Sequence, residues 1–241
     1  MTELIPDPTQ TKAFIKALKK PKDLIRLRAF YPAGHPFKAT DAGAKSAPST
    51  EVVKKWQKDG RGVYIVVNDG GDKDDSITSC RAFFCEWDDR PKEWQVDAWK
   101  SLGLPEPTIQ VDTGGKSIHT YWVLKKSIDP LKWKSIQTRL LEHTDADRAL
   151  KNPSRVMRLA GTFYMNKDGS AGPMAQIIRD TEKYYCVSEI EKALPTEKFF
   201  EKILASNRFT EYKPSPVSEI KNALDKIQDI LETIPLAGEF P

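Results

Sequence analysis

The sequence predicts an α+β fold in which helices pack on a mixed sheet. Strand-like and helix-like segments alternate along the chain, but they do not follow the regular β-α-β repeat of a doubly wound parallel sheet. Two strand-like segments, residues 107–112 and 117–124, flank a short turn with Gly114 and Gly115, which is typical of an antiparallel hairpin. A chain of 241 residues is long enough for one large domain, or for a domain with an appendage.

The first half of the chain is expected to supply amphipathic helices and apolar strands. Phe14 and Leu18 fall on one face of the first helix. Ser49 or Thr50 can cap the second helix, and Gly60 ends it. The expected elements are a helix at residues 9–20, a strand at 23–31, a polar loop at 34–48, a helix at 50–58, a strand at 62–68, a flexible acidic loop at 69–75, a strand at 82–88 and a helix at 91–102.

The second half continues with helices, strands and a separable tail. The linker is indicated by Pro214 and Pro216, and the tail that follows has the apolar spacing of a helix. We therefore expect a core domain at residues 1–205 and a linker with a helical appendage at residues 206–241, where a further region of a longer protein begins. After the hairpin, the expected elements are a helix at residues 130–141, strands at 175–180 and 183–187, helices at 188–194 and 197–205, a linker at 206–216 and a helix at 217–234.

Composition and charge place the chain only in the broad class of globular proteins. The chain is 39% hydrophobic and 30% charged, which is ordinary for a globular protein. Its net charge of +4 neither requires nor excludes a nucleic-acid partner. The 3 cysteines show no metal-ligand spacing, and without a secretory signal their odd number favours reduced thiols in the cytoplasm. No apolar run approaches membrane-spanning length, so we expect no membrane partner.

Two acids follow the apolar run at residues 82–85. In an extended chain Glu86 and Asp88 lie on one face and Asp89 lies on the other. Two carboxylates directed at one point repel each other, and a cation between them makes the arrangement stable. The alternative is that these acids are solvated turn residues, and the pair alone does not decide between the two interpretations.

The second part of the predicted hairpin begins with polar residues next to the glycine pair. Alternation places Ser117, His119 and Tyr121 on one face of the strand, so Ser117 and His119 can contact the same ligand. A hydroxyl and an imidazole both donate hydrogen bonds to phosphate oxygens. Lys116 suits the same phosphates, but an exposed hairpin lysine is nearly as good an interpretation. We favour phosphate binding for His119; the alternative is a core histidine that faces Tyr121.

A third polar segment contains two acids and two arginines. Asp145 and Asp147 are both candidates for a further carboxylate ligand, although Asp145 can be a residue that only caps a helix. Arg155 and Arg158 flank apolar residues, so at least one guanidinium must emerge from a mostly buried segment. A phosphate is a natural partner for it, and a surface salt bridge is the alternative.

Lysines gather in two further clusters. Such clusters are most often solvated faces, and here they are also candidates for contacts with a nucleic-acid backbone. Their members are Lys16, Lys19, Lys20, Lys22, Lys125, Lys126, Lys132 and Lys134.

These three motifs together resemble the catalytic core of the archaeo-eukaryotic primase superfamily. The order is acid-x-acid, then Ser-x-His, then an aspartate ahead of an Arg-x-x-Arg-Leu-x-Gly-Thr run. The resemblance spans residues 63–162 and is strongest to the primase-polymerases of plasmids, phages and other mobile elements. The chain departs from the family pattern at Glu86, where aspartate is commoner, and at Ala160, where a proline usually precedes the glycine.

The resemblance implies a fold and a set of site residues. The fold would be a mixed-sheet, RRM-like catalytic core with an N-terminal α/β subdomain, all within residues 1–205. Asp147 is favoured over Asp145, because its distance from the arginine run is the usual one. The metal ligands, for Mg²⁺ or Mn²⁺, would be Glu86, Asp88 and Asp147, and the nucleotide-binding residues would be Lys116, Ser117, His119, Arg155 and Arg158.

The resemblance also implies an activity and its partners. The expected activity is that of a template-directed primase-polymerase, which transfers a nucleotide from a (d)NTP to a 3′ hydroxyl with two metal ions. Its partners would be a single-stranded DNA template, a primer strand and a helicase or helicase region, in a phage or plasmid replication complex or at the nucleoid. Two alternatives remain: a replication-initiator or nucleic-acid-binding module with little polymerase activity, and a metal-dependent nuclease.

Overall fold

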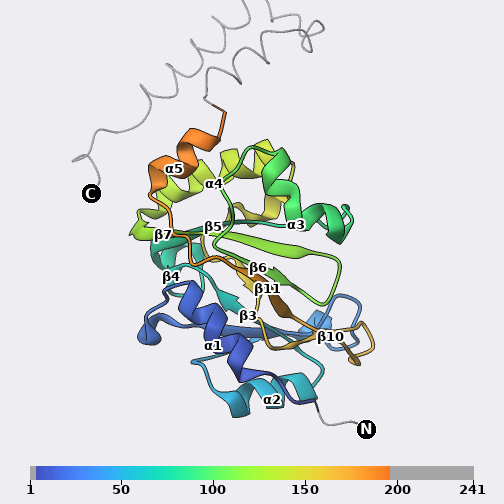
Figure 1. Ribbon diagram of the computed structural model, residues 1–241. Helices are drawn as coiled ribbons and strands as arrows, with labels where there is room; N and C mark the ends of the chain where they lie inside the picture. Colours follow the sequence, from blue (N-terminus) through green and yellow to red (C-terminus); the bar gives the residue numbers. More distant parts are fainter. Residues whose placement is uncertain (1–3, 196–241) are drawn as a thin grey trace, which may run out of the picture. The chain divides into compact units, whose positions relative to one another are not determined.

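The protein was analysed as a computed structural model that describes residues 4–195 (Figure 1). The helix expected at 197–205, the linker at 206–216, the helix at 217–234 and the domain boundary after residue 205 lie outside the described residues. The helices are α1 (Pro8–Ala17), α2 (Thr50–Lys58), α3 (Lys92–Ser101), α4 (Pro130–Thr144) and α5 (Val187–Ala193). Within residues 4–195 every helix is too short or too polar to cross a lipid bilayer.

The strands of this part of the chain form three sheets. A five-stranded sheet has the order β11-β6-β7-β5-β4, a four-stranded sheet the order β2-β1-β3-β8, and β9 pairs with β10. The strands are β1 (Leu27–Phe30), β2 (Ala44–Ser46), β3 (Gly62–Val66), β4 (Asp69–Gly70), β5 (Ile77–Cys85), β6 (Ile109–Asp112), β7 (Ile118–Ile128), β8 (Val156–Arg158), β9 (Phe163–Met165), β10 (Ala171–Met174) and β11 (Gln176–Asp180).

The expected α+β class is confirmed. In Figure 1, α3, α4 and α5 lie on one side of the five-stranded sheet, and α1 and α2 lie on the other. Because β5 is covered on both faces, residues 80–85 are buried without alternation. The named strands pair in antiparallel fashion, and the parallel component of the expected mixed sheet is one bridge between Leu124 and Tyr185.

Local signals placed several elements correctly. Helix α2 has the expected bounds, and the Ser49 hydroxyl accepts a hydrogen bond from the Val52 amide at its start. The predicted hairpin is the β6–β7 pair, in which Val111 lies opposite His119.

Other expectations for the strands were wrong. Residues 183–187 do not form a strand, because only Tyr185 reaches β7 and α5 begins at Val187. Residues 22–24 form a turn of 3₁₀ helix, since the Arg26 guanidinium donates to the Asp23 carbonyl and bends the chain before β1. Strand β5 ends at Cys85, so the predicted site acids follow the strand instead of ending it.

The acidic loop at 69–75 and the first lysine cluster are also corrected. Asp69 is buried in β4, and the Lys20 ammonium lies 3.1 Å from its Oδ1 with the Lys20 side chain fully buried. Arg81 of β5 donates two hydrogen bonds to the same carboxylate. Burial lowers the pKa of Lys20 to about 8, against the opposing attraction of Asp69. Lys20 is therefore no nucleic-acid contact; it joins the end of α1 to the sheet.

Candidate active site

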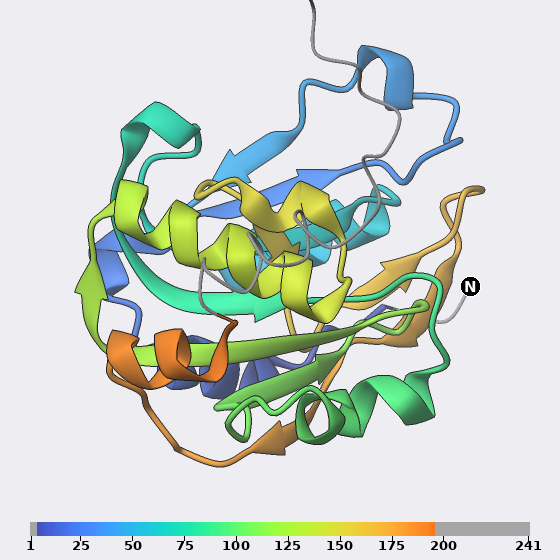
Figure 2. The same ribbon diagram turned by 90° about the horizontal axis from the view of Figure 1, so that it is seen from above.

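The end of β5 adjoins the start of β7 (Figure 2), and four of the predicted site residues lie there: Glu86, Asp88, Ser117 and His119. Cys85 lies opposite Thr120, so the next position on each strand brings Glu86 to His119. The His119 Nε2 atom lies 2.7 Å from Glu86 Oε2, and both side chains are largely buried. The second ring nitrogen, Nδ1, lies 3.2 Å from the Tyr121 hydroxyl. His119 therefore lies between the acid and the core tyrosine; it faces Tyr121, as the core interpretation expected, and its pairing with Glu86 was not predicted.

The surroundings of Glu86 favour its ionised form. Burial raises the pKa of this carboxyl, but the charge and hydrogen bond of His119 act against burial, together with Arg155 and Ser117. The net pKa lies below the ordinary value of 4.5. A buried carboxylate is thus kept charged at neutral pH, as a cation ligand must be.

Asp88 is held by the residue at the start of β7. The Ser117 hydroxyl donates a hydrogen bond of 2.5 Å to Asp88 Oδ1. Ser117 itself is buried, whereas Asp88 is exposed. The predicted shared face of Ser117 and His119 is therefore directed at the two acids.

A buried glutamine sets the position of this strand start. Gln95 of α3 accepts a hydrogen bond of 2.7 Å from the Ile118 amide and donates one of 3.2 Å to the Lys116 carbonyl. Its amide also donates to the Arg90 carbonyl at 2.7 Å. One side chain thus ties together the segments that follow β5 and precede β7. Sequence reasoning missed Gln95, because a glutamine in an amphipathic helix has no distinguishing pattern.

Asp147 reaches the same place from α4. Its amide donates to the Glu86 carbonyl at 3.2 Å, which places the two backbones side by side. Its Oδ1 accepts from the Ala149 amide, and its Oδ2 lies 3.7 Å from the Arg155 guanidinium. Asp145 is instead the exposed C-cap of α4 and pairs with Arg148.

Within residues 4–195, no group of three or more His, Cys, Asp or Glu side chains is arranged as a metal centre. The donor set nevertheless fits a hard divalent ion, because Glu86, Asp88 and Asp147 offer carboxylate oxygens. In the structure each carboxylate already has a protein partner. His119 pairs with Glu86, Arg155 with Asp147, and the Ser117 hydroxyl donates to Asp88. The metal site therefore stays a prediction.

Arg158 lies between two tyrosines that the sequence analysis did not single out. Its Cζ is 4.4 Å from the ring centre of Tyr64, its cross-strand neighbour, and 5.2 Å from that of Tyr164. Its Nη1 is buried and has no hydrogen-bond partner among the described residues. A cation held by ring faces, with a donor left over, is suited to an anionic ligand.

The glycine pair permits close packing of the β6–β7 turn. Gly114 has φ +73°, and a Cβ on Gly115 would lie 2.6 Å from a ring carbon of Tyr164. The turn consequently lies directly on β9, and Tyr164 connects it to Arg158. Lys116 is exposed beside this turn, so both interpretations of it remain open.

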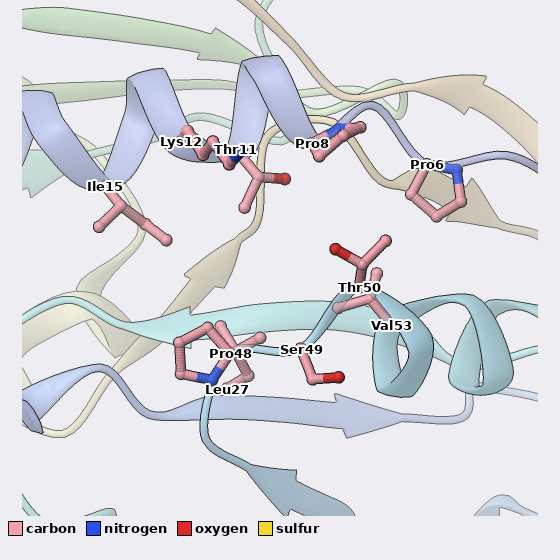
Figure 3. A pocket seen from close by; sticks show the side chains of 10 residues that line it. All are labelled: Pro6, Pro8, Thr11, Lys12, Ile15, Leu27, Pro48, Ser49, Thr50 and Val53. Carbon is pink, nitrogen blue, oxygen red and sulfur yellow. The ribbon is translucent and has the colours of Figure 1, made fainter. Parts of the chain in front are cut away.

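A separate pocket lies away from these residues (Figure 3). It measures about 200 Å³ and lies between α1, the start of α2 and β1, and none of the predicted site residues lines it. Its lining consists of Pro6, Pro8, Thr11, Lys12, Ile15, Leu27, Pro48, Ser49, Thr50 and Val53.

Solved structures with this fold are known. The chain is similar to the AEP domain of the primase-polymerase (PrimPol) of cyanophage S-2L, with 38% sequence identity and a TM-score of 0.73, over 79% of this chain and 100% of that domain. It also shares its fold with the catalytic domain of primase RepB′ in complex with initiator DNA, at 16% identity and a TM-score of 0.55, over 83% of this chain and 98% of that one. A second RepB′ structure matches at 16% identity and a TM-score of 0.56, over 92% of this chain and 68% of that one. No family model and no curated protein matches the sequence.

The fold and the similarities define the class as a primase-type nucleotidyltransferase domain. The full coverage of the cyanophage domain at 38% identity identifies the family. The chain belongs to the archaeo-eukaryotic primase (AEP) superfamily, as a primase-polymerase domain.

Proposed function

We propose that the chain is a template-directed primase-polymerase that transfers a nucleotide from a (d)NTP to a 3′ hydroxyl during replication of a phage or other mobile element. The observation that supports this most strongly is that His119 pairs with Glu86 and Ser117 with Asp88, while the backbone of Asp147 is bonded to that of Glu86. Two similar structures support the proposal: the S-2L protein is a primase-polymerase of a cyanophage, and a RepB′ primase structure contains initiator DNA.

The three carboxylates would hold Mg²⁺ or Mn²⁺, which lowers the pKa of an attacking hydroxyl and stabilises negative charge on a triphosphate. Glu86 contributes a charge that the protein keeps ionised, because His119 and Arg155 lower its pKa. Ser117 orients Asp88 through its hydroxyl. The protein's own contribution is mainly position and fixed charge, as in other phosphoryl transfers.

The nucleotide would bind on the side of the basic residues. Arg158 has a buried donor without a partner among the described residues, and it is wedged between two rings that restrict its motion. Arg155 lies beside Asp147, and Lys116 stands exposed beside the packed turn. A triphosphate provides enough oxygens for these donors and for His119, whereas a nuclease has no pyrophosphate to hold.

The proposed partners are a single-stranded DNA template, a primer strand and a helicase region or a separate helicase. A primer-extension assay with labelled nucleotides and Mg²⁺ or Mn²⁺ tests it. Elongation supports the proposal, shortening of the primer supports a nuclease, and DNA binding without either supports an initiator module.

The matched variants are Asp88→Ala and Asp89→Ala. Both residues are exposed, but only Asp88 contacts Ser117. We expect extension to be lost in Asp88→Ala and kept in Asp89→Ala. Equal activity of the two variants would remove Asp88 from the proposed site.

A further inference from the structure

A column of stacked groups stands outside the active site, in the loop that follows β1. The Cζ of Arg61 lies 4.1 Å from the ring centre of Tyr31, and the Tyr31 and His35 rings are stacked with centres 4.3 Å apart and planes at 9°. The ring of Phe37 packs against this column at a tilt: its plane is 52° from that of His35, with ring centres 5.5 Å apart, and 60° from that of Tyr31, with ring centres 5.7 Å apart. We call residues 31–41 the platform loop.

The base of the column is fixed. Asp41 accepts a hydrogen bond of 2.6 Å from Arg61 and one of 3.0 Å from the Tyr31 amide. The Phe37 amide donates to His35 Nδ1 at 3.2 Å. The platform loop is therefore shaped by its own contacts, and its last ring is presented in a defined orientation.

The ring of Phe37 is open to solvent, since the residue is 61% exposed. A single exposed hydrophobic residue is ordinary on a protein surface. Here, however, the ring packs against a prearranged stack of Arg61, Tyr31 and His35. A ligand that stacks on it would meet little entropic cost of ordering the loop.

Two lysines lie in or against the platform loop that carries Phe37. Lys38 is its neighbour in sequence and is exposed. Lys167, in the turn between β9 and β10, lies against the platform loop, because a Cβ on Gly34 would be 3.3 Å from its Cδ. The nearby Asp168 accepts hydrogen bonds from Ser170 within its own turn. Two lysines from separate segments therefore belong to the surface of the platform loop, although the Lys38 ammonium lies 5.2 Å from the ring centre of Phe30.

The same hairpin also touches the active site. Tyr164 of β9 packs on Gly115 of the β6–β7 turn, while the far end of the hairpin meets the platform loop at His35 and Gly169. Figure 2 shows the short helical turn of residues 38–40 and the β9–β10 hairpin projecting on the same side of the molecule. One hairpin therefore contacts both the predicted nucleotide site and the platform loop.

We propose that Phe37, Lys38 and Lys167 form a binding surface for single-stranded nucleic acid, with one base stacked on Phe37 and phosphates beside the two lysines. Base stacking on an exposed aromatic ring flanked by cations is the usual basis of sequence-tolerant single-strand binding. The choice of partner rests on the proposed function, in which single-stranded DNA is the template.

The test measures fluorescence anisotropy of a labelled thymidine 20-mer with the full chain, without metal or nucleotide. Phe37→Ala should weaken binding by about fivefold or more, and Phe37→Trp should retain it. Leu131→Ala is the matched control, because Leu131 is also exposed (79%) but lies on α4. Lys38→Gln and Lys167→Gln should each lower the slope of log Kd against log salt by roughly 0.7.

A 20-mer with 5-iodouracil, photo-crosslinked to the unaltered chain, should modify the peptide that contains Phe37. Three results would each overturn the inference. They are an unchanged affinity in Phe37→Ala, crosslinks confined to other peptides, and no binding of the 20-mer at all. Weakening of dTTP binding alone, with oligonucleotide affinity kept, would also overturn it. Primer extension by the same preparations separates the two proposals: an unaltered chain that binds the 20-mer through Phe37 but adds no nucleotide contradicts the proposed function and leaves this surface in place.

Discussion

Replacement of His119 by alanine removes one partner of a buried pair and tests the proposed site most broadly. The Nε2 atom of His119 lies 2.7 Å from Glu86 Oε2, with side-chain exposures of 7% and 15%. Hydrogen bonds to charged groups contribute about 1.5–3 kcal/mol. For a chain of this size, that loss corresponds to a fall in Tm of about 3–12 °C.

The pH dependence of the difference in stability has a defined sign. The pKa of Glu86 lies below 4.5 in the folded protein, so its contribution to stability is present above that pH and is lost as pH falls through the folded pKa. In His119→Ala the pKa of Glu86 should rise, because burial remains and His119, the strongest influence that opposes it, is gone. The difference in Tm between the unaltered protein and His119→Ala should therefore have its full size at pH 7 and become smaller below pH 4.5.

The assay combines thermal unfolding with a nucleotide titration. His119→Ala should also weaken nucleotide binding more than binding of single-stranded DNA. His143→Ala is the control, since His143 loses only a bond of 2.8 Å to the Leu102 carbonyl, and it should leave nucleotide affinity unchanged. An unchanged Tm at pH 7 would refute the buried pair. A lowered Tm with nucleotide affinity equal to that of His143→Ala would show that His119 holds Glu86 but binds no phosphate.

Two further predictions concern stability and the domain boundary. Asp69→Asn should lower the free energy of unfolding by about 3–5 kcal/mol in urea, because Lys20 and Arg81 are left in the interior without their counter-charge; a loss below about 1 kcal/mol would contradict this. Truncation at Ser206 should leave a folded domain that binds Mn²⁺ and nucleotide, since every proposed ligand lies within residues 4–195; an insoluble or molten product would move the boundary.

Local sequence patterns were enough to predict which side chains of the β7 start lie near the acids after β5. The alternation of side chains along a strand predicted that Ser117 and His119 share one face. In the structure Ser117 contacts Asp88 and His119 contacts Glu86, the acids that follow β5. The cap at Ser49 and the glycine turn between β6 and β7 were read from residue types with strong backbone preferences.

Other features depend on contacts between distant parts of the chain. Lys20 became a buried residue because Asp69, far along the chain, supplies its counter-charge. The strands β8, β9 and β10 have three or four residues each, too few for a clear alternation, although Asp168 and Gly169 are a turn signal that could have indicated the β9–β10 hairpin. The role of Tyr164 follows from its packing on Gly115, which no spacing in the sequence reveals.

The central claim is that Asp147 joins Glu86 and Asp88 in a site for nucleotidyl transfer. Asp147 and Asp145 are two residues apart, but only the Asp147 amide bonds to Glu86, whereas Asp145 is an exposed helix cap. The direct measurement is the single-turnover rate of nucleotide addition to a primed template by Asp147→Asn and Asp145→Asn, with Mg²⁺ and with Mn²⁺. We predict a loss of at least about a hundredfold, comparable to removal of a group that stabilises developing charge, for Asp147→Asn and a near-normal rate for Asp145→Asn. Normal addition by Asp147→Asn would contradict the account.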